Sequence, residues 1–162
     1  MTSSSSSIPA AQRTELLQRY AEGPAEVVAA LAGCTAEELD RSYPGEWSAR
    51  QVVHHLADSE TASYSRVRML LVSDSAAIVG YDENLYAQKL RYDRPIEASL
   101  AVFSAVRASC VELLELVPDD QWSRSGTHSE SGPYGMEDWL RIYAAHAHDH
   151  ADQIRRARRG EK

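Results

Sequence analysis

Residues 136–157 read MEDWLRIYAAHAHDHADQIRRA, and large apolar side chains and histidines recur there every three or four positions. This spacing predicts an amphipathic α-helix. Its inward face carries Trp139, Tyr143, His146 and His150. Side chains four positions apart on a helix are neighbours, about 5–6 Å apart at Cβ, so His146 and His150 can direct two imidazoles at one ion. His148 is two positions from each of them and points to the opposite side.

The HxxxH spacing by itself is weak evidence for a metal site. Two neutral imidazoles buried side by side need partners, and a metal ion satisfies both at once. A pair of hydrogen-bonded core histidines, or a solvated polar face, has the same spacing, and for an isolated HxxxH these ordinary alternatives are favoured. The metal interpretation therefore depends on a third ligand from elsewhere in the chain.

A second predicted helix offers that ligand. Ser48 and Gln51 form a capping box, which predicts a helix from there to about Val72. Its inward stripe consists of Val52, His55, Leu56, Ser59 and Ala62. His54 and His55 are adjacent and point about 100° apart, so only one of them can face the core. We expect His55 to face the core and His54 to be solvated or at the helix flank.

His55, His146 and His150 would together provide three neutral nitrogen ligands. Three protein ligands leave coordination positions for water or substrate, which is the pattern of catalytic rather than structural sites. Imidazole suits zinc, nickel, iron and copper, and the sequence does not choose among them. We expect one divalent ion, with zinc or nickel as the first candidates.

Two further helical segments precede these in the chain. The first begins at about Pro9, and Gly23-Pro24 should interrupt it because proline lacks the N–H that an interior helix turn requires. Helix should resume at Pro24 and stop at Gly33. Thr35 and Glu38 then form a capping box that opens a short helix.

A fourth long helix should run from Pro95 to Pro118. Its apolar stripe consists of Ile96, Leu100, Phe103, Val106, Cys110, Leu113 and Val117. Residues 73–94 and 119–135 are long connections, the first with a short helix at about 82–90, and no long alternating strand pattern appears. Four long helices with two long connections indicate an all-α four-helix bundle in which neighbouring helices can be parallel.

The chain has 162 residues and a formal net charge of -7. We expect one soluble domain at residues 8–159, with flexible ends at 1–7 and 160–162. The acidic excess argues against a nucleic-acid partner. No stretch has the apolar length of a membrane span or the character of a signal peptide. Two cysteines that match no metal or redox motif suit a reducing, cytoplasmic location.

The motifs around these histidines resemble the signature of the DinB superfamily, and most closely its YfiT-like branch. The resemblance is carried by residues 47–59 (WSARQVVHHLADS), 63–66 (SYSR), 81–83 (YDE), 128–132 (HSESG) and 146–154 (HAHDHADQI). It covers most of the chain, from about Leu16 to Ile154. The combined pattern is specific, unlike HxxxH alone.

The resemblance implies an up-down-down-up four-helix bundle, frequent homodimers and one metal ion on His55, His146 and His150. Position 148, a histidine here, is arginine in some relatives, which agrees with its place outside the ligand set. Members are described as metal-dependent hydrolases, some transfer a low-molecular-weight thiol such as bacillithiol or mycothiol, and others have no assigned activity. Fold and metal therefore carry over better than reaction.

For the reaction we expect metal-dependent transfer of a small thiol onto an electrophile, with hydrolysis as the alternative. A metal ion stabilises thiolate over thiol, so no protein cysteine is needed, and Cys34 and Cys110 are implausible nucleophiles. Hydrolysis usually needs a general base, and Asp149, beside His150, should point away from the site face, although a loop could supply one. A third possibility is a non-catalytic, stress-associated metal-binding protein.

Four other side chains stay open at this point. Arg50, Tyr64 and Arg66 could help to bind an anionic substrate or could be ordinary surface residues of a helix. His128 lies in the Ser/Gly-rich loop before the last helix. It is either a solvated loop histidine or a residue at the mouth of the site.

Overall fold

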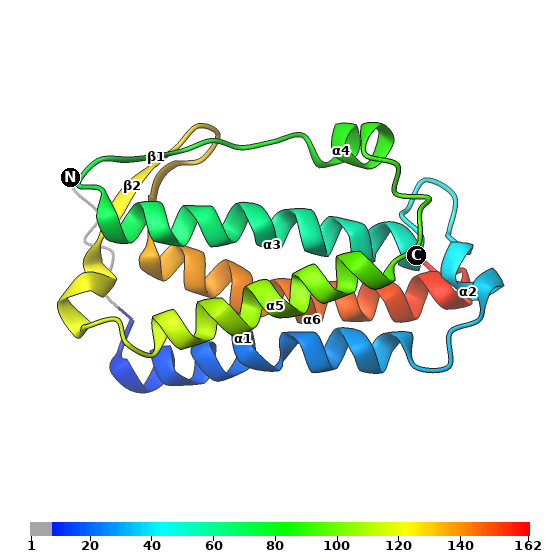
Figure 1. The fold of residues 1–162 in the computed structure, drawn as a ribbon, viewed down its shortest axis with the longest axis horizontal. Helices are drawn as coiled ribbons and strands as arrows, with labels where there is room; N and C mark the ends of the chain where they lie inside the picture. Colours follow the sequence, from blue (N-terminus) through cyan, green and yellow to red (C-terminus); the bar gives the residue numbers. More distant parts are fainter. Residues whose placement is uncertain (1–7) are drawn as a thin grey trace.

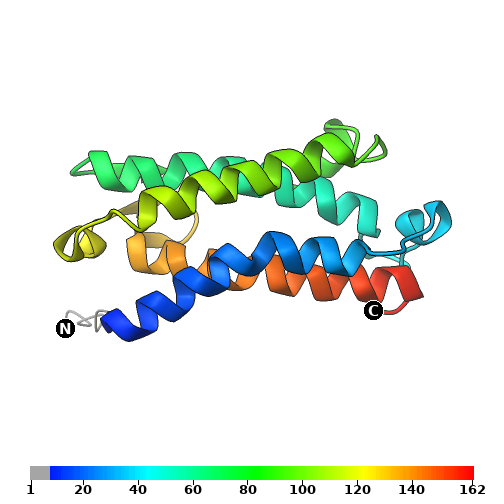
Figure 2. The same ribbon diagram turned by 60° about the horizontal axis from the view of Figure 1, so that its bottom comes forward.

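The computed structural model describes residues 8–162, so the expected flexible end at residues 1–7 lies outside the described part. Four long helices form the body of the structure (Figure 1). They are α1 (Ala10–Leu31), α3 (Ala49–Val72), α5 (Glu97–Leu114) and α6 (Met136–Arg159). α1 and α6 run in one direction, and α3 and α5 run in the other (Figures 1 and 2). The predicted up-down-down-up four-helix bundle is confirmed.

Parallel helices are direct neighbours in this bundle. α1 packs along α6, and α3 packs along α5. α3 and α5 follow one another among the four long helices, so the connection between them must return along the length of the bundle, which explains why it is long. The connection from α5 to α6 stays at one end of the bundle (Figure 1). Apolar side chains fill the space between the helices in two clusters, one around the Tyr20 and Trp139 rings, which lie 5.2 Å apart, and one around Phe103 and Ile154. None of the helices in residues 8–162 has the length and apolar character needed to cross a bilayer.

The predicted helix starts agree with the structure where side chains cap them. Thr35 caps the short helix α2 (Ala36–Asp40) and Ser48 caps α3, each in a complete capping box. Asp82 caps α4 (Glu83–Lys89), the short helix expected in the first long connection. In each case the cap side chain satisfies a backbone N–H that the first helix turn leaves free.

The long connections contain a small sheet that the sequence analysis did not predict. Its strands are β1 (Ala76–Ile78), β2 (Ser125–His128) and β3 (Gly132–Gly135), with a 3₁₀ turn at Asp119–Ser123. β1 is parallel to β2, and β2 is antiparallel to β3. A Cβ on Gly126 would clash with the backbone of Ala76, so glycine allows the two strands to pair. The sheet ties the two connections together at the end of the bundle where α6 begins (Figure 1).

The predicted interruption at Gly23-Pro24 was wrong, because α1 continues through it. Pro24 leaves the carbonyl of Tyr20 without its usual donor four residues later. The buried guanidinium of Arg107 replaces that donor, with Nη1 2.7 Å from the Tyr20 carbonyl oxygen. The orphaned carbonyl is therefore satisfied from another helix.

α5 also departs from its predicted stripe. It ends at Leu114 rather than near Pro118, and Val106 and Leu113 are only partly buried. Arg107 is fully buried instead, and it forms an ion pair with the equally buried Glu60 of α3. Apolar periodicity could not reveal a core arginine, since a charged residue is buried only when its partners come from other segments.

Candidate metal centre

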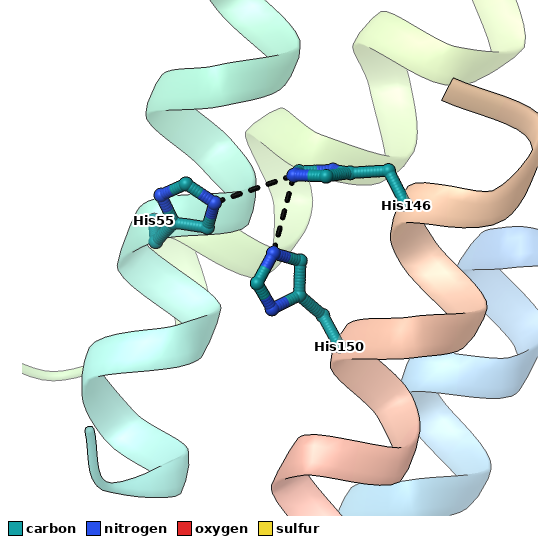
Figure 3. A group of neighbouring side chains, drawn as sticks. All are labelled: His55, His146 and His150. Atoms are coloured by element: carbon teal, nitrogen blue, oxygen red, sulfur yellow. Dashed lines mark hydrogen bonds between the residues drawn. The ribbon is translucent and has the colours of Figure 1, made fainter. Parts of the chain in front are cut away.

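Three histidine side chains meet between α3 and α6. His55 extends from α3, and His146 and His150 extend from successive turns of α6 (Figure 3). The Nε2 atoms of His55 and His146 lie 3.3 Å apart, and those of His146 and His150 lie 3.1 Å apart. One nitrogen from each ring falls within 4.8 Å of the other two. The structure thus brings together the three residues that the sequence analysis selected.

These separations fit a common metal ligand shell. Two nitrogens bound tetrahedrally at about 2.0–2.1 Å to zinc lie about 3.3 Å from each other. A neutral imidazole has one donor and one acceptor nitrogen, so converging Nε2 atoms cannot all satisfy one another through hydrogen bonds. The donor set, all nitrogen and uncharged, suits zinc, nickel and related divalent ions.

Burial keeps these imidazoles in the neutral form that binds metals. It lowers the pKa of His55 to about 3, and the nearby His150 adds to the shift. Burial likewise lowers the pKa of His146, with further contributions from His150 and His55. It also lowers the pKa of His150, although the hydrogen bond to Gln153 opposes that shift. At neutral pH no proton therefore competes with a cation for the nitrogens.

A hydrogen bond to a neighbouring side chain orients the ring of His150 but not the rings of His55 and His146. Nδ1 of His150 lies 2.7 Å from Oε1 of Gln153, so Nδ1 carries the proton and Nε2 is left as an acceptor. Nδ1 of His55 and Nδ1 of His146 are buried without a hydrogen-bond partner in the described residues. The Trp47 ring packs against His55 at 4.9 Å and closes that side of the site.

The neighbouring histidines are not part of the cluster. His54 is fully buried, not solvated as expected. Its Nδ1 lies 2.8 Å from Ser99 Oγ and its Nε2 lies 3.0 Å from the Arg94 carbonyl oxygen, so it ties α3 to the start of α5. His148 lies on the other side of α6, with Nε2 2.9 Å from the carbonyl oxygen of Arg19.

A cavity of about 240 Å³ opens beside His146. Ten residues from α3, α4, α6, β2 and the loops line it: Ser59, Arg66, Gly80, Tyr81, Glu83, His128, Glu130, Ile142, Tyr143 and His146. Of the four side chains whose roles the sequence left undecided, Arg66 and His128 line this cavity. Arg50 pairs with Asp40 at a different cavity. Tyr64 lies with its ring 3.3 Å from the guanidinium carbon of Arg68.

Glu83 and Glu130 were not among the predicted site residues. Glu83 is the first residue of α4 in the long loop from α3 to α5, and Glu130 lies between β2 and β3 in the long loop from α5 to α6. The only signal for them in the sequence was their place in the YDE and HSESG motifs that carry the family resemblance. Local helical periodicity says nothing about side chains in such loops.

Both cysteines lie away from the cavity. Cys110 is buried in the core beside Arg68, and Cys34 is partly exposed at the end of α1. Burial raises the pKa of both thiols. Neither side chain is therefore an activated nucleophile.

Comparisons with known proteins agree with this architecture. The family model of the DinB superfamily matches residues 19–154. A protein of Oceanobacillus iheyensis, provisionally named a metal-dependent hydrolase, is 38% identical over 120 residues, which cover 73% of this chain and 69% of that protein. YfiT of Bacillus subtilis, with the same provisional name, is 33% identical over 152 residues, or 91% of this chain and 85% of YfiT.

A solved structure of Bacillus subtilis YfiT is also similar. It has a TM-score of 0.88 and 32% sequence identity, and the match covers 96% of this chain and 92% of that one. It is described as a four-helix bundle with an unusual topology, which agrees with the parallel neighbours seen here. The extent of the family match and these similarities show that the chain belongs to the DinB superfamily, with YfiT-like relatives named as metal-dependent hydrolases.

Proposed function

We propose that this chain is a metal-dependent hydrolase of a small molecule, with one divalent ion, zinc or nickel, held by His55, His146 and His150. The observation that carries the proposal is the convergence of three neutral imidazole nitrogens beside a cavity that two carboxylates line. When bound, the ion supplies Lewis acidity and lowers the pKa of water or of a thiol. The names of the relatives support the same reaction class.

The side chains around the cavity have separate roles in this proposal. Glu83 or Glu130 accepts a proton from the attacking water. His128 accepts a hydrogen bond at Nδ1 from the backbone N–H of Glu130, at 3.2 Å, which leaves Nε2 as the protonated nitrogen of the neutral ring. That N–H is a donor for the leaving group. Arg66 holds an anionic part of the substrate.

Thiol transfer is the second candidate. Neither cysteine lines the cavity, so the nucleophile of this reaction would be a small thiol from outside the protein. Thiol transfer was the first expectation from the sequence because no suitable general base was evident there. Glu83 and Glu130 line the cavity and are candidate general bases, so we now prefer hydrolysis.

Metal content tests the first half of the proposal. Zinc and nickel are measured by elemental analysis after reconstitution of the wild type and of His146→Ala/His150→Ala. We expect one ion per chain in the wild type and none in the double variant. His148→Ala is the matched control, since this histidine lies on the same helix outside the cluster, and it should retain one ion. Equal metal content in all three proteins would exclude the three-histidine site.

The reaction is tested with two sets of substrates on the same metal-loaded protein. Hydrolysis is followed with ester and amide libraries, and thiol transfer is followed with monochlorobimane and bacillithiol, mycothiol or glutathione. Metal-dependent turnover in the first set supports the hydrolase, and turnover confined to the second set supports the transferase. Stoichiometric metal without turnover in either set would favour the third candidate, a non-catalytic metal-binding protein.

Three further expectations stay predictions. The family resemblance leads us to propose a homodimer, which light scattering at micromolar concentration tests. We also propose a cytoplasmic location and a single domain at residues 8–159. Limited proteolysis should trim the chain only outside that range.

A further inference from the structure

The cavity beside His146 is lined by unpaired side chains of both charges. Arg66 comes from α3, Glu83 is the first residue of α4, and Glu130 follows β2. Within residues 8–162, none of the three forms an ion pair with another charged side chain. Their charges are therefore available to a ligand.

Neutral groups hold Arg66 in place. Its Nη1 donates to the Tyr143 hydroxyl at 3.2 Å, and its Nη2 donates to the Val79 carbonyl at 3.0 Å. A guanidinium has five N–H donors, so some of them remain free. Because the planar fork matches a carboxylate, a fixed arginine without a carboxylate partner is suited to bind one from a ligand.

The two carboxylates are also placed without partners. The carboxylate of Glu130 lies over Gly80, where a Cβ would come within 2.5 Å of its oxygens, so glycine makes room for it. No described residue donates a hydrogen bond to the carboxylate of Glu83 or Glu130. Glu83 is exposed, and partial burial of its carboxylate raises its pKa, Arg66 opposes that shift, and the charge of Glu130 adds to it. A ligand cation between the two carboxylates would relieve this repulsion.

A third observation comes from a neutral group at the same cavity. The hydroxyl of Tyr81 is buried and forms no hydrogen bond in the described part of the chain. Buried hydroxyls are normally paired. The phenol is therefore a further polar group in the wall of the cavity that has no partner of its own.

We propose that the cavity binds a small molecule that carries both a carboxylate and an ammonium group, as amino-acid derivatives do. This inference rests on the proposed function and names the class of its substrate. The carboxylate pairs with Arg66, and the ammonium group lies between Glu83 and Glu130. An anion alone would face two carboxylates, and a cation alone would face an arginine. A molecule with both charges satisfies all three side chains.

The test uses the dipeptide L-alanyl-L-alanine as the probe. Its binding to the full chain, made metal-free on a chelating resin, is followed by the amide NMR shifts of cavity residues such as Gly80 and Tyr81. Two matched probes each lack one charge: N-acetyl-L-alanyl-L-alanine lacks the ammonium group, and L-alanyl-L-alaninamide lacks the carboxylate. We expect each to bind at least about tenfold more weakly than the parent dipeptide.

Variants assign each charge to its partner. Glu83→Gln/Glu130→Gln should weaken binding of the parent dipeptide about tenfold and should not weaken binding of the N-acetyl form. Arg66→Gln should weaken the parent dipeptide but not the alaninamide, and Arg66→Lys should recover part of the loss. Glu112→Gln changes an exposed carboxylate of α5 outside the cavity and should have no effect. The dispersion of the NMR spectrum shows that each variant is folded.

Two outcomes would overturn the inference. One is the absence of shifts at the cavity with millimolar dipeptide, and the other is equal affinity for all three probes. Zinc is then added to the same metal-free samples, and its binding is measured. This measurement separates the inference from the proposed function. Zinc bound without any response to the dipeptides refutes only the substrate class, and a selective response to the dipeptides without zinc binding refutes only the metal site.

Discussion

Arg107 donates a hydrogen bond to the backbone carbonyl of Tyr20, the carbonyl that Pro24 leaves unpaired within α1. The same guanidinium donates to the Tyr143 carbonyl on α6 at 2.9 Å and to the carboxylate of Glu60 on α3. One buried side chain of α5 thus joins all four helices. It also holds α6 at the turn that precedes His146.

The first prediction is that Arg107→Met strongly destabilises the fold. The substitution leaves the buried carboxylate of Glu60 and the Tyr20 carbonyl without their partner, and loss of one member of a buried ion pair costs about 3–5 kcal/mol. The free energy of unfolding is measured by urea denaturation. Arg91→Met breaks an exposed pair with Asp93 and should leave the midpoint unchanged. Adding Glu60→Gln to Arg107→Met should recover part of the loss, since it removes the uncompensated charge.

The second prediction is that Gly23, although it lies inside a helix, is more favourable for stability than alanine because its neighbours leave no room for a Cβ. Alanine in a helix interior is ordinarily more stable than glycine by about 0.5–1 kcal/mol. Here a Cβ would clash with Nη1 of Arg107 and lie 2.7 Å from Cβ of Ala147. We expect Gly23→Ala to destabilise the protein by about 1–3 kcal/mol. The double variant with Ala147→Gly should lose less stability than the sum of the single variants. A more stable Gly23→Ala protein would show that α1 and α6 are not in close contact.

The course of α1 shows which features of the fold can be predicted from the sequence and which cannot. The helix starts at Thr35, Ser48 and Asp82 were predictable because the cap and its partner lie within three residues of each other. The continuity of α1 was not, because the donor that replaces Pro24 is 87 positions from Tyr20. Local rules contain no information on such a contact.

The residues of the candidate site also fall into those that local sequence patterns predict and those that depend on distant contacts. His146 and His150 share a helix face, and His55 was found because the stripe of its helix is regular. His54 was misplaced because its buried partners, Ser99 and the Arg94 carbonyl, come from another segment. The cavity wall with Glu83 and Glu130 depends on the small sheet, whose strands have three or four residues each. Strands this short do not display an alternating pattern.

The third prediction is that the fold survives metal removal. Most buried side chains are apolar and pack between the helices, so the helices should stay folded without the ion. The ion should add stability only because it binds the native state and not the unfolded state. Zinc at one hundred times its dissociation constant should add about 2.7 kcal/mol of stability, seen as a lower melting temperature after treatment with chelator. Far-UV circular dichroism at 25 °C should not change. Loss of helical signal in chelator would identify the metal as structural.

The fourth prediction is a pH dependence of the metal-free protein. Burial lowers the native pKa of His55 to about 3 and also lowers the native pKa values of His146 and His150, whereas an unfolded histidine titrates near about 6.5. Below that pH the unfolded state binds protons that the native state does not, so the free energy of unfolding must fall as the pH falls. Each imidazole that stays neutral at pH 5 should cost about 1–2 kcal/mol relative to pH 7.

Urea denaturation between pH 7 and pH 5, in the presence of chelator, measures this slope. The variant His146→Gln/His150→Gln removes two of the three titrating groups, and its stability should fall less over the same range. Other groups, such as the buried His54 and Glu60, are common to both proteins and cancel in the difference. Parallel curves for the wild type and the variant would mean that the imidazoles are protonated in the native metal-free protein. The cluster would then have to open and hydrate below pH 7, because three imidazolium groups cannot stay together at a nitrogen separation of 3.1–3.3 Å.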